Sequence, residues 1–329
     1  MAELKMRVAL GQFQELTDEM CIYVKQLGAN DFLMNTPRLP GEHRLEYEDL
    51  KGLVDKSTGH GLRLMALENV PVHYYEKAML GLPGRDEQIE HMSETIRNMG
   101  KAGIPILGYH WMPNKVWRTP EPAELRGGAK GTRFNMEEHP EGELTHEREY
   151  TAGEMWDNYV YYLERILPVA EEAGVTLALH PDDPPLPVVR GQPRLVYQHH
   201  MYQRLLDLHV SDHNGLEFCV GTLAEMTEGD IYDCVDAYTR FGAVKYIHLR
   251  NVRGQVPHYH ETFIDEGDLD VERVFEILHK NGYEGLVIPD HAPQMVCDAP
   301  WHAGMAFAMG YLKAMLTSTA PAGSQWKSA

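Results

Sequence analysis

Short apolar segments alternate with longer amphipathic segments along nearly the whole chain. Each short segment has the length and composition of a strand that is buried on both faces, as strands of a parallel sheet are. We expect eight such strands, at Val8–Phe13, Asp31–Met34, Leu62–Leu67, Ile104–Tyr109, Val175–His180, Leu216–Val220, Val244–Leu249 and Leu286–Asp290.

The segments between these strands have helical periodicity, and several end at a glycine, which is typical of helix C-termini. The predicted helices are Asp18–Leu27, Leu45–His60, Arg85–Ala102, Gly153–Ala173, His199–Val210, Asp230–Phe241, Asp270–Asn281 and Gly304–Thr317. Strand–helix units repeated in this way predict an α/β fold, a (β/α)₈ TIM barrel, with residues 1–319 as a single catalytic domain. A doubly wound open sheet is the alternative, but no Gly-x-Gly-x-x-Gly motif follows the first strand.

Two segments interrupt the alternation of strands and helices. Residues 117–150 are rich in Pro, Gly, Glu and Arg, and an insertion of this kind after the fourth strand is expected to be a lid or an interface arm. Residues 250–270 form a second long loop, after the seventh strand. Both begin at carboxyl ends of strands, where barrels carry their active sites. Residues 320–329 are expected to be a flexible tail.

Each of the last four strands delivers a potential metal ligand, and these are His180, Cys219, His248 and Asp290. Any one of them has an ordinary structural explanation, such as a buried thiol or a capping carboxylate. Four coincidences at equivalent strand ends are much harder to explain, so we predict one divalent metal site with nitrogen, sulfur and oxygen ligands. Ligand type favours zinc, iron, cobalt or manganese without choosing among them.

The motifs that carry these residues resemble those of the mannonate dehydratase family. They read His180-Pro-Asp-Asp-Pro-Pro185, Phe218-Cys219-Val-Gly-Thr222, His248-Leu-Arg-Asn-Val252 and Pro289-Asp290-His291, and the resemblance extends from about Ala9 to Leu316. It implies a metal-dependent barrel enzyme that dehydrates D-mannonate to 2-keto-3-deoxy-D-gluconate. It also implies that His180, Cys219, His248 and Asp290 hold a Mn²⁺-type ion, with Fe²⁺, Co²⁺ or Zn²⁺ as alternatives, and that His291 is catalytic.

The chain departs from the family pattern after the Pro-Asp-His motif. Where the family has a catalytic tyrosine in a Gly-Tyr-Ser context, this chain has His302, and Phe307 stands at the position of a later arginine. An imidazole that titrates near neutrality thus replaces a phenol of high pKa. Loss of the arginine removes an anchor for a carboxylate. These differences bear on the choice of substrate.

Dehydration of a sugar acid requires one group to remove the C2 proton and another to protonate the departing C3 oxygen. We predict His291 and His302 for these two roles, with His110, His258 and His260 in reserve. The predicted substrate-binding residues are Arg250, His110, His260 and Arg85, whereas Asp182 and Asp183 are expected to orient His180 or its loop.

Composition limits the setting and the partners. The formal net charge of −19 disfavours nucleic acid, because a basic face is lacking. No apolar run approaches the length of a membrane span, the N-terminal sequence lacks a signal peptide, and the four cysteines show no CxxC pair. We therefore expect a cytoplasmic enzyme of small sugar acids that binds neither nucleic acid nor membrane. A homo-oligomer is the expected assembly, and aromatic and Met-rich segments are candidates for its interface, although periodicity alone does not separate them from core.

Two alternatives remain open from the sequence. The first is a metal-dependent sugar isomerase or epimerase on the same scaffold, although such enzymes usually hold their metal through several carboxylates. The second is a sugar-acid-binding protein whose catalysis has decayed, which the missing tyrosine and arginine would explain.

Overall fold

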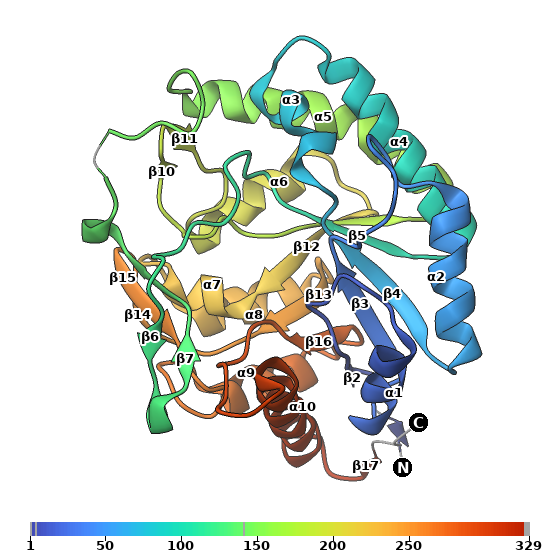
Figure 1. Ribbon diagram of the computed structural model, residues 1–329, viewed down its shortest axis with the longest axis vertical. Coiled ribbons are helices and arrows are strands. Elements are labelled where there is room, and N and C mark those ends of the chain that lie inside the picture. Colours follow the sequence, from blue (N-terminus) through green and yellow to red (C-terminus); the bar gives the residue numbers. More distant parts are fainter. Residues whose placement is uncertain (1, 4, 141, 326–329) are drawn as a thin grey trace.

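A computed structural model describes residues 2–3, 5–140 and 142–325. The eight predicted strands form one parallel sheet in the order β2-β16-β13-β12-β9-β5-β4-β3 (Figure 1). The sheet closes on itself, because Leu10, just after β2, bridges to Phe32 of β3, and the Leu33 N–H donates to the Leu10 carbonyl at 2.9 Å. The predicted TIM barrel is therefore confirmed, and closure excludes the doubly wound alternative. The barrel strands are β2 (Arg7–Val8), β3 (Asp31–Asn35), β4 (Arg63–Glu68), β5 (Ile106–Tyr109), β9 (Thr176–Leu179), β12 (Asn214–Cys219), β13 (Val244–Leu249) and β16 (Leu286–Pro289).

Helices surround the sheet, and all eight predicted ones occur with boundaries shifted by a few residues (Figure 1). They are α1 (Asp18–Gln26), α2 (Tyr47–Gly59), α4 (Arg85–Ala102), α5 (Ala152–Ala173), α6 (Tyr202–Leu208, preceded by the 3₁₀ turn His199–Met201), α8 (Ile231–Arg240), α9 (Val271–Lys280) and α10 (Pro300–Ser318). Two short helices, α3 (Glu76–Leu80) and α7 (Val220–Glu225), were not predicted, because five or six residues are too few to show a period. Among the described residues, no helix combines the length and the apolar character required to cross a bilayer.

Both interruptions of the barrel contain short strands that composition did not predict. In residues 250–270, β14 (Val252–Gln255) and β15 (His258–Glu261) form an antiparallel hairpin. The insertion contributes β6 (Ala123–Glu124), β7 (Lys130–Gly131) and β8 (Arg133–Asn135), and β8 pairs with β15. Figure 1 shows β6, β7, β14 and β15 together at one side of the barrel. The two interruptions are therefore one structural unit beside the carboxyl ends of the strands.

Two further pairs of short strands lie outside the barrel sheet. Near the termini, β17 (Ser324–Gln325) pairs with β1 (Ala2–Glu3). After β9, the two-residue strands β10 (Val188–Val189) and β11 (Gln192–Pro193) form a hairpin. The end of the expected flexible tail, residues 326–329, lies outside the described residues.

The barrel bore changes character along its axis, which positions the site. Away from the carboxyl ends of the strands, small and apolar side chains fill the bore, among them Ala9, Leu33, Ala66 and Ala178. Toward the carboxyl ends of the strands the buried residues become ionisable, beginning with Glu217 and His248. Fully buried charged residues are rare unless they are paired or bind a metal, so this polar layer marks the functional end of the barrel.

Candidate metal centre

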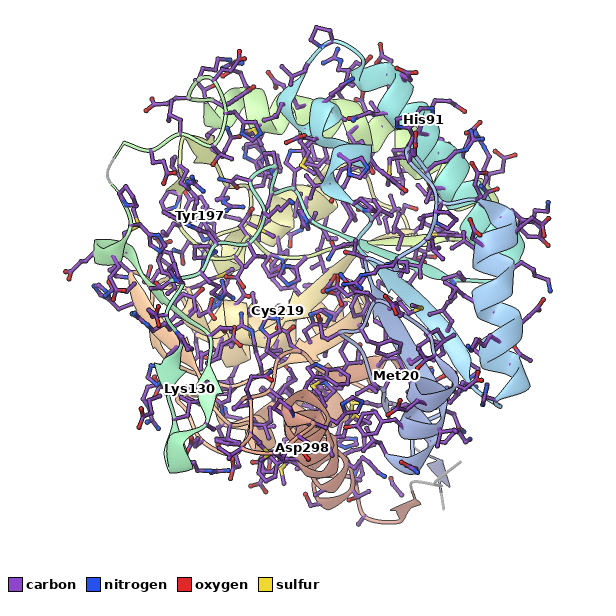
Figure 2. All side chains as sticks on the ribbon, viewed as in Figure 1. Met20, His91, Lys130, Tyr197, Cys219 and Asp298 are labelled. Carbon is purple, nitrogen blue, oxygen red and sulfur yellow. The ribbon has the colours of Figure 1, made fainter. Side chains whose placement is uncertain are left out.

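Three of the four predicted ligands converge at one point. His180, Cys219 and His248 stand at the carboxyl ends of β9, β12 and β13, and their ligand atoms all lie within 4.8 Å of one another. The parallel register pairs Cys219 directly with His248. The fourth predicted ligand, Asp290, follows β16: its Oδ2 accepts from Cys219 Sγ at 3.4 Å, and its Oδ1 lies 3.6 Å from His248 Nδ1. Cys219 accordingly lies near the middle of the molecule in Figure 2.

The hydrogen bonding of these groups suits a metal ion. Both ring nitrogens of His248 are buried without a hydrogen bond, as is Glu217 Oε1. Glu68 Oε2 lies 2.8 Å from His248 Nε2 and Glu217 Oε1 lies 3.1 Å from Nδ1, so these are close ionic contacts outside hydrogen-bond geometry. Burial raises the pKa of the Cys219 thiol, but Arg250 and the two histidines outweigh it and lower the pKa to about 6. A thiol that ionises easily beside unsatisfied imidazoles fits a divalent transition ion.

Two buried glutamates at the site were missed by the sequence analysis. Glu217 lies inside β12 with no exposed surface, and Glu68 ends β4; with His248 they form a second group of potential ligands. Glu68 is held by the amides of Gln12 and Asn35, which donate to it at 2.8–3.2 Å. Burial raises the pKa of Glu217 to about 7, against the attraction of His248. A glutamate within an otherwise apolar strand was the available signal, since such a side chain must point into the bore or against a helix.

His291 lies beside the metal centre and is held by a third glutamate that the sequence analysis assigned no role. Its Nδ1 lies 3.0 and 2.9 Å from the two carboxylate oxygens of Glu261, which ends β15. Its Nε2 faces the other way, 3.4 Å from Asp290 Oδ1. Burial lowers the pKa of His291, but Asp290 and Glu261 raise it to about 9. Glu261 is thus placed to fix the ring of His291 with Nε2 directed at the site.

Arg250 does not have the environment of a substrate anchor. Its Nε donates to Asp290 at 2.8 Å, Nη1 to Glu225 at 2.5 Å and Nη2 to Asp183 at 3.1 Å, and the side chain is fully buried. A close backbone approach makes this possible, since a Cβ at Gly221 of α7 would lie 2.4 Å from Arg250 Cγ. We therefore correct its predicted role: Arg250 holds buried carboxylates, including a candidate ligand.

Of the predicted substrate-binding residues, His110 is the one that lines the cavity over the metal donors. Its Nδ1 accepts the Met112 N–H at 3.2 Å, and burial lowers its pKa to about 3, so the ring is neutral. The acceptor role of Nδ1 places the proton on Nε2.

Arg85 and His260 lie elsewhere. Arg85 begins α4 on the outer side of the barrel, with its guanidinium 3.7 Å from the ring centre of Tyr161 on α5. His260 lies on β15 next to Glu261, and because side chains alternate along a strand, Glu261 takes the direction of the site. Neither residue is in the lining of the cavity, and we withdraw both from the substrate-binding set.

His302 and Phe307 lie on α10, at the rim. The His302 ring packs against Tyr23 and Trp301, with centroid distances of 4.7 and 5.1 Å, and lines a depression of about 570 Å³. Phe307 is partly exposed and contacts Phe263 edge-on, so it is away from the metal donors.

Asp182 and Asp183 stabilise the loop after β9, whereas the Nδ1 of His180 pairs with the Pro181 carbonyl at 2.6 Å. Asp182 accepts the N–H groups of Leu195 and Val196 at 2.8 and 2.6 Å. Asp183 binds Arg118 and Arg250. Of the two predicted roles, orienting the loop is the one that this geometry fits.

The cavity over the donors has a volume of about 140 Å³ and adjoins larger spaces. Through Asp290 and His291 it shares a wall with a chamber of about 360 Å³ that Pro122, Lys130 and Trp301 enclose. Through Asn69 and His110 it shares a wall with an open depression of about 550 Å³. In Figure 2, Lys130 lies toward the edge of the molecule on β7, so the insertion forms the outer wall of the chamber.

Comparison with known proteins agrees with this geometry. Residues 6–148 and 141–319 match the family model described as D-mannonate dehydratase (UxuA). A mannonate dehydratase of Thermotoga petrophila is 33% identical over 283 residues, which cover 75% of this chain and 76% of that protein. The crystal structure of mannonate dehydratase from Streptococcus suis superposes with a TM-score of 0.86 at 27% identity, covering 97% of this chain and 94% of that one.

A xylose isomerase domain protein from Planctomyces limnophilus shares the fold, with a TM-score of 0.64 at 13% identity over 96% of this chain and 99% of that one. At this identity the likeness extends to the barrel alone. The extensive family match decides the assignment: the chain belongs to the mannonate dehydratase family and is an enzyme of the lyase class, a hydro-lyase.

Proposed function

We propose that this enzyme carries out the metal-dependent dehydration of D-mannonate to 2-keto-3-deoxy-D-gluconate. The observation that supports this most directly is the convergence of nitrogen, sulfur and oxygen donors from successive strand ends, with His291 directly beside them. An epimerase would share the fold, but the thiol among the donors and the family membership both favour the dehydratase.

The proposed ligands are His180, Cys219, His248 and Asp290, which lie at one place in the barrel mouth. Mn²⁺ is the expected ion, with Fe²⁺, Co²⁺ or Zn²⁺ as alternatives that the ligand types also accept. When bound, a divalent ion supplies positive charge that stabilises the anion formed after removal of a proton next to a carboxylate.

His291 is the proposed acceptor of the C2 proton. Nδ1–H donates to Glu261 and Nε2 is directed at the cavity, so Nε2 is the nitrogen that would take the proton when the ring is in its neutral form. A carboxylate that holds the other nitrogen of a histidine fixes its tautomer and increases its basicity. Glu261 is in turn fixed by Arg118, whose Nη2 lies 3.3 Å from Oε1. Glu261 is therefore a positioning residue and His291 the catalytic residue.

His302 is the proposed donor of a proton to the departing C3 hydroxyl. The depression that it lines shares Gln12 and Asn35 with the cavity over the metal donors. An imidazole has an ordinary pKa near neutrality and can serve as an acid where the family uses a phenol.

The test is a panel of aldonic acids incubated with purified enzyme and Mn²⁺, with detection of 2-keto acid and of the exchange of the C2 proton with solvent. D-mannonate should give the 2-keto-3-deoxy acid. His291→Ala should abolish both signals, whereas His302→Ala should slow product formation and retain C2 exchange. His258→Ala is the matched control, because His258 is half exposed on β15 and should leave turnover intact. Epimerised or isomerised aldonate without loss of water would contradict the proposal.

Cytoplasmic location and homo-oligomeric assembly stay predictions from the sequence, as do the single-domain boundary at residue 319 and the role of residues 117–150 as a lid or an interface arm.

A further inference from the structure

Positive backbone φ angles gather at the mouth of the barrel on the side opposite the metal donors. Among the described residues, five that are not glycine have positive φ, and four of them line the cavity or the depressions that adjoin it: Gln12, Thr36, Asn69 and Lys115, with φ of 66°, 44°, 66° and 61°. They follow the first four barrel strands in order. Such backbone costs on the order of 1 kcal/mol for a residue with a side chain and tends to persist at functional sites. Glycine would adopt these φ angles without strain, so the presence of other residues at these four positions indicates that their side chains have a function.

The cavity wall on this side is built from neutral hydrogen-bonding groups. Gln12 and Asn35 are already engaged, because their amides bind Glu68, and Asn35 also donates to Gln12 at 3.0 Å. Asn69 is different: its Oδ1 is buried without a hydrogen-bond partner. Its neighbour His110 uses Nδ1 to accept the Met112 N–H and keeps Nε2–H to donate. Asn69 Oδ1 thus remains an unsatisfied acceptor in this wall, and His110 Nε2–H a donor.

These two residues also stand where the cavity widens. Asn69 and His110 both line the cavity of about 140 Å³ and the depression of about 550 Å³. A ligand that extends from the metal donors toward this depression would therefore run along both side chains. Asn69 Oδ1 is a neutral acceptor and His110 Nε2–H a neutral donor, and such groups suit hydroxyl groups; the cation on this side, Lys115, lines the outer depression.

We propose that Asn69, together with His110, forms a subsite for the hydroxyl groups of the sugar-acid chain and that Asn69 selects acids by chain length. This inference rests on the proposed function for the identity of the ligand. The carboxylate end of the substrate lies at the metal donors, and a hydroxyl of the outer chain donates to Asn69 Oδ1. A shorter acid does not reach the subsite, so Asn69 Oδ1 stays unpaired and the acid gains no binding free energy from a hydrogen bond there.

The decisive variant is Asn69→Gly. It removes the amide and relaxes a φ of 66°, so the protein should fold at least as stably as the wild type. Asn69→Asp retains an acceptor of the same shape. Arg190→Gly is the control for strain relief alone, because Arg190 has φ of 47° but lies in the β10–β11 turn.

The experiment compares D-mannonate with a four-carbon aldonate of the same C2 and C3 configuration. In the Mn²⁺-loaded wild type, kcat/KM should favour the six-carbon acid. Asn69→Gly should reduce that preference about tenfold, the value of one hydrogen bond, mainly through KM. Asn69→Asp should recover most of the preference, and Arg190→Gly should retain all of it.

Equilibrium binding of both acids, measured by calorimetry on the same Mn²⁺-loaded proteins, separates this inference from the proposed function. Suppose that neither acid is turned over, but that the wild type binds the six-carbon acid more tightly and Asn69→Gly does not. The dehydratase proposal would then be wrong and the subsite would stand. An unchanged preference in Asn69→Gly, in binding or in kcat/KM, would overturn the subsite, and so would failure of both acids to bind.

Discussion

Replacement of Glu261 by Gln should slow turnover of D-mannonate while leaving KM and the metal content nearly unchanged. The carboxylate of Glu261 contacts Nδ1 of His291 through both oxygens, at 3.0 and 2.9 Å, and is buried. It touches the imidazole of His291, the proposed catalytic residue, without belonging to the cluster of candidate metal donors. The change should therefore affect the chemical step more than binding.

The size of the effect follows from the contact that is lost. A hydrogen bond to a charged group contributes about 1.5–3 kcal/mol, roughly twice a neutral one, and glutamine keeps a neutral acceptor. The loss in transition-state stabilisation is therefore about half of that contribution, about 0.75–1.5 kcal/mol, which corresponds to a rate reduced about 3- to 13-fold. Complete removal of a carboxylate that orients a functional histidine typically costs about 10- to 100-fold, so glutamine should be the milder change.

The fold should survive this substitution. Arg118 and Arg250 lose one negative neighbour but keep Asp183, and Arg250 also keeps Glu225 and Asp290. Steady-state kinetics, elemental analysis of bound metal and thermal unfolding should be measured together. Glu266→Gln is the matched control: the same chemical change is made just beyond the hairpin, where the partly exposed Glu266 pairs with Arg126 at 3.4 Å.

Full turnover in Glu261→Gln would refute the positioning role. A loss of activity that follows loss of metal would also refute it, because Glu261 would then act through the candidate ligand Asp290.

Three further predictions concern the metal, a helix cap and acid stability. Cys219→Ala should lose stoichiometric metal by elemental analysis and lose turnover; an active, metal-replete variant would remove Cys219 from the ligand set. Thr151→Ala breaks the capping box in which Thr151 and Glu154 bond each other's backbone at the start of α5, and should lower the free energy of urea unfolding by about 1 kcal/mol. Burial holds the pKa of His110 at about 3 in the folded state, below its unfolded value near 6.5, so its contribution to stability is complete above pH ~6.5 and is lost as pH falls toward 3. His110→Gln should flatten the decline in unfolding free energy across this window, by up to roughly 4 kcal/mol, and an unchanged decline would exclude His110 as its source.

The sequence was sufficient for the barrel because the signals it depends on are local. Apolar segments with strand length, helices ended by glycine, and a ligand at each of the last strand ends all follow from short stretches of chain. Cys219 and His248, for example, meet because neighbouring parallel strands end at the same edge.

The errors arose where the direction of a side chain depends on tertiary structure. His260 and Glu261 are adjacent, and only their pairing with β14 and β8 decides which of the two faces the site. Arg85 was predicted to bind substrate, yet the helix it begins is on the outer layer and its guanidinium stacks on Tyr161. Glu217 was hidden within an apolar strand, because periodicity cannot distinguish the bore from the helix-facing side when both are buried.

The insertion contributes directly to the site, which its composition could not reveal. Arg118, at its start, binds both Asp183 and Glu261 and is largely buried. Its strand β8 extends the hairpin that carries Glu261, and Phe134 of β8 stacks on Tyr259, with ring centroids 5.7 Å apart. Tyr259 in turn donates to Asp183 at 3.0 Å.

Asp183 also binds Arg250, the partner of Asp290, so the insertion, the hairpin and a candidate metal ligand share one network of buried charges. Because an unpaired charge in such a network is costly, any movement of the insertion must keep Arg118 in place or alter the hold of Glu261 on His291.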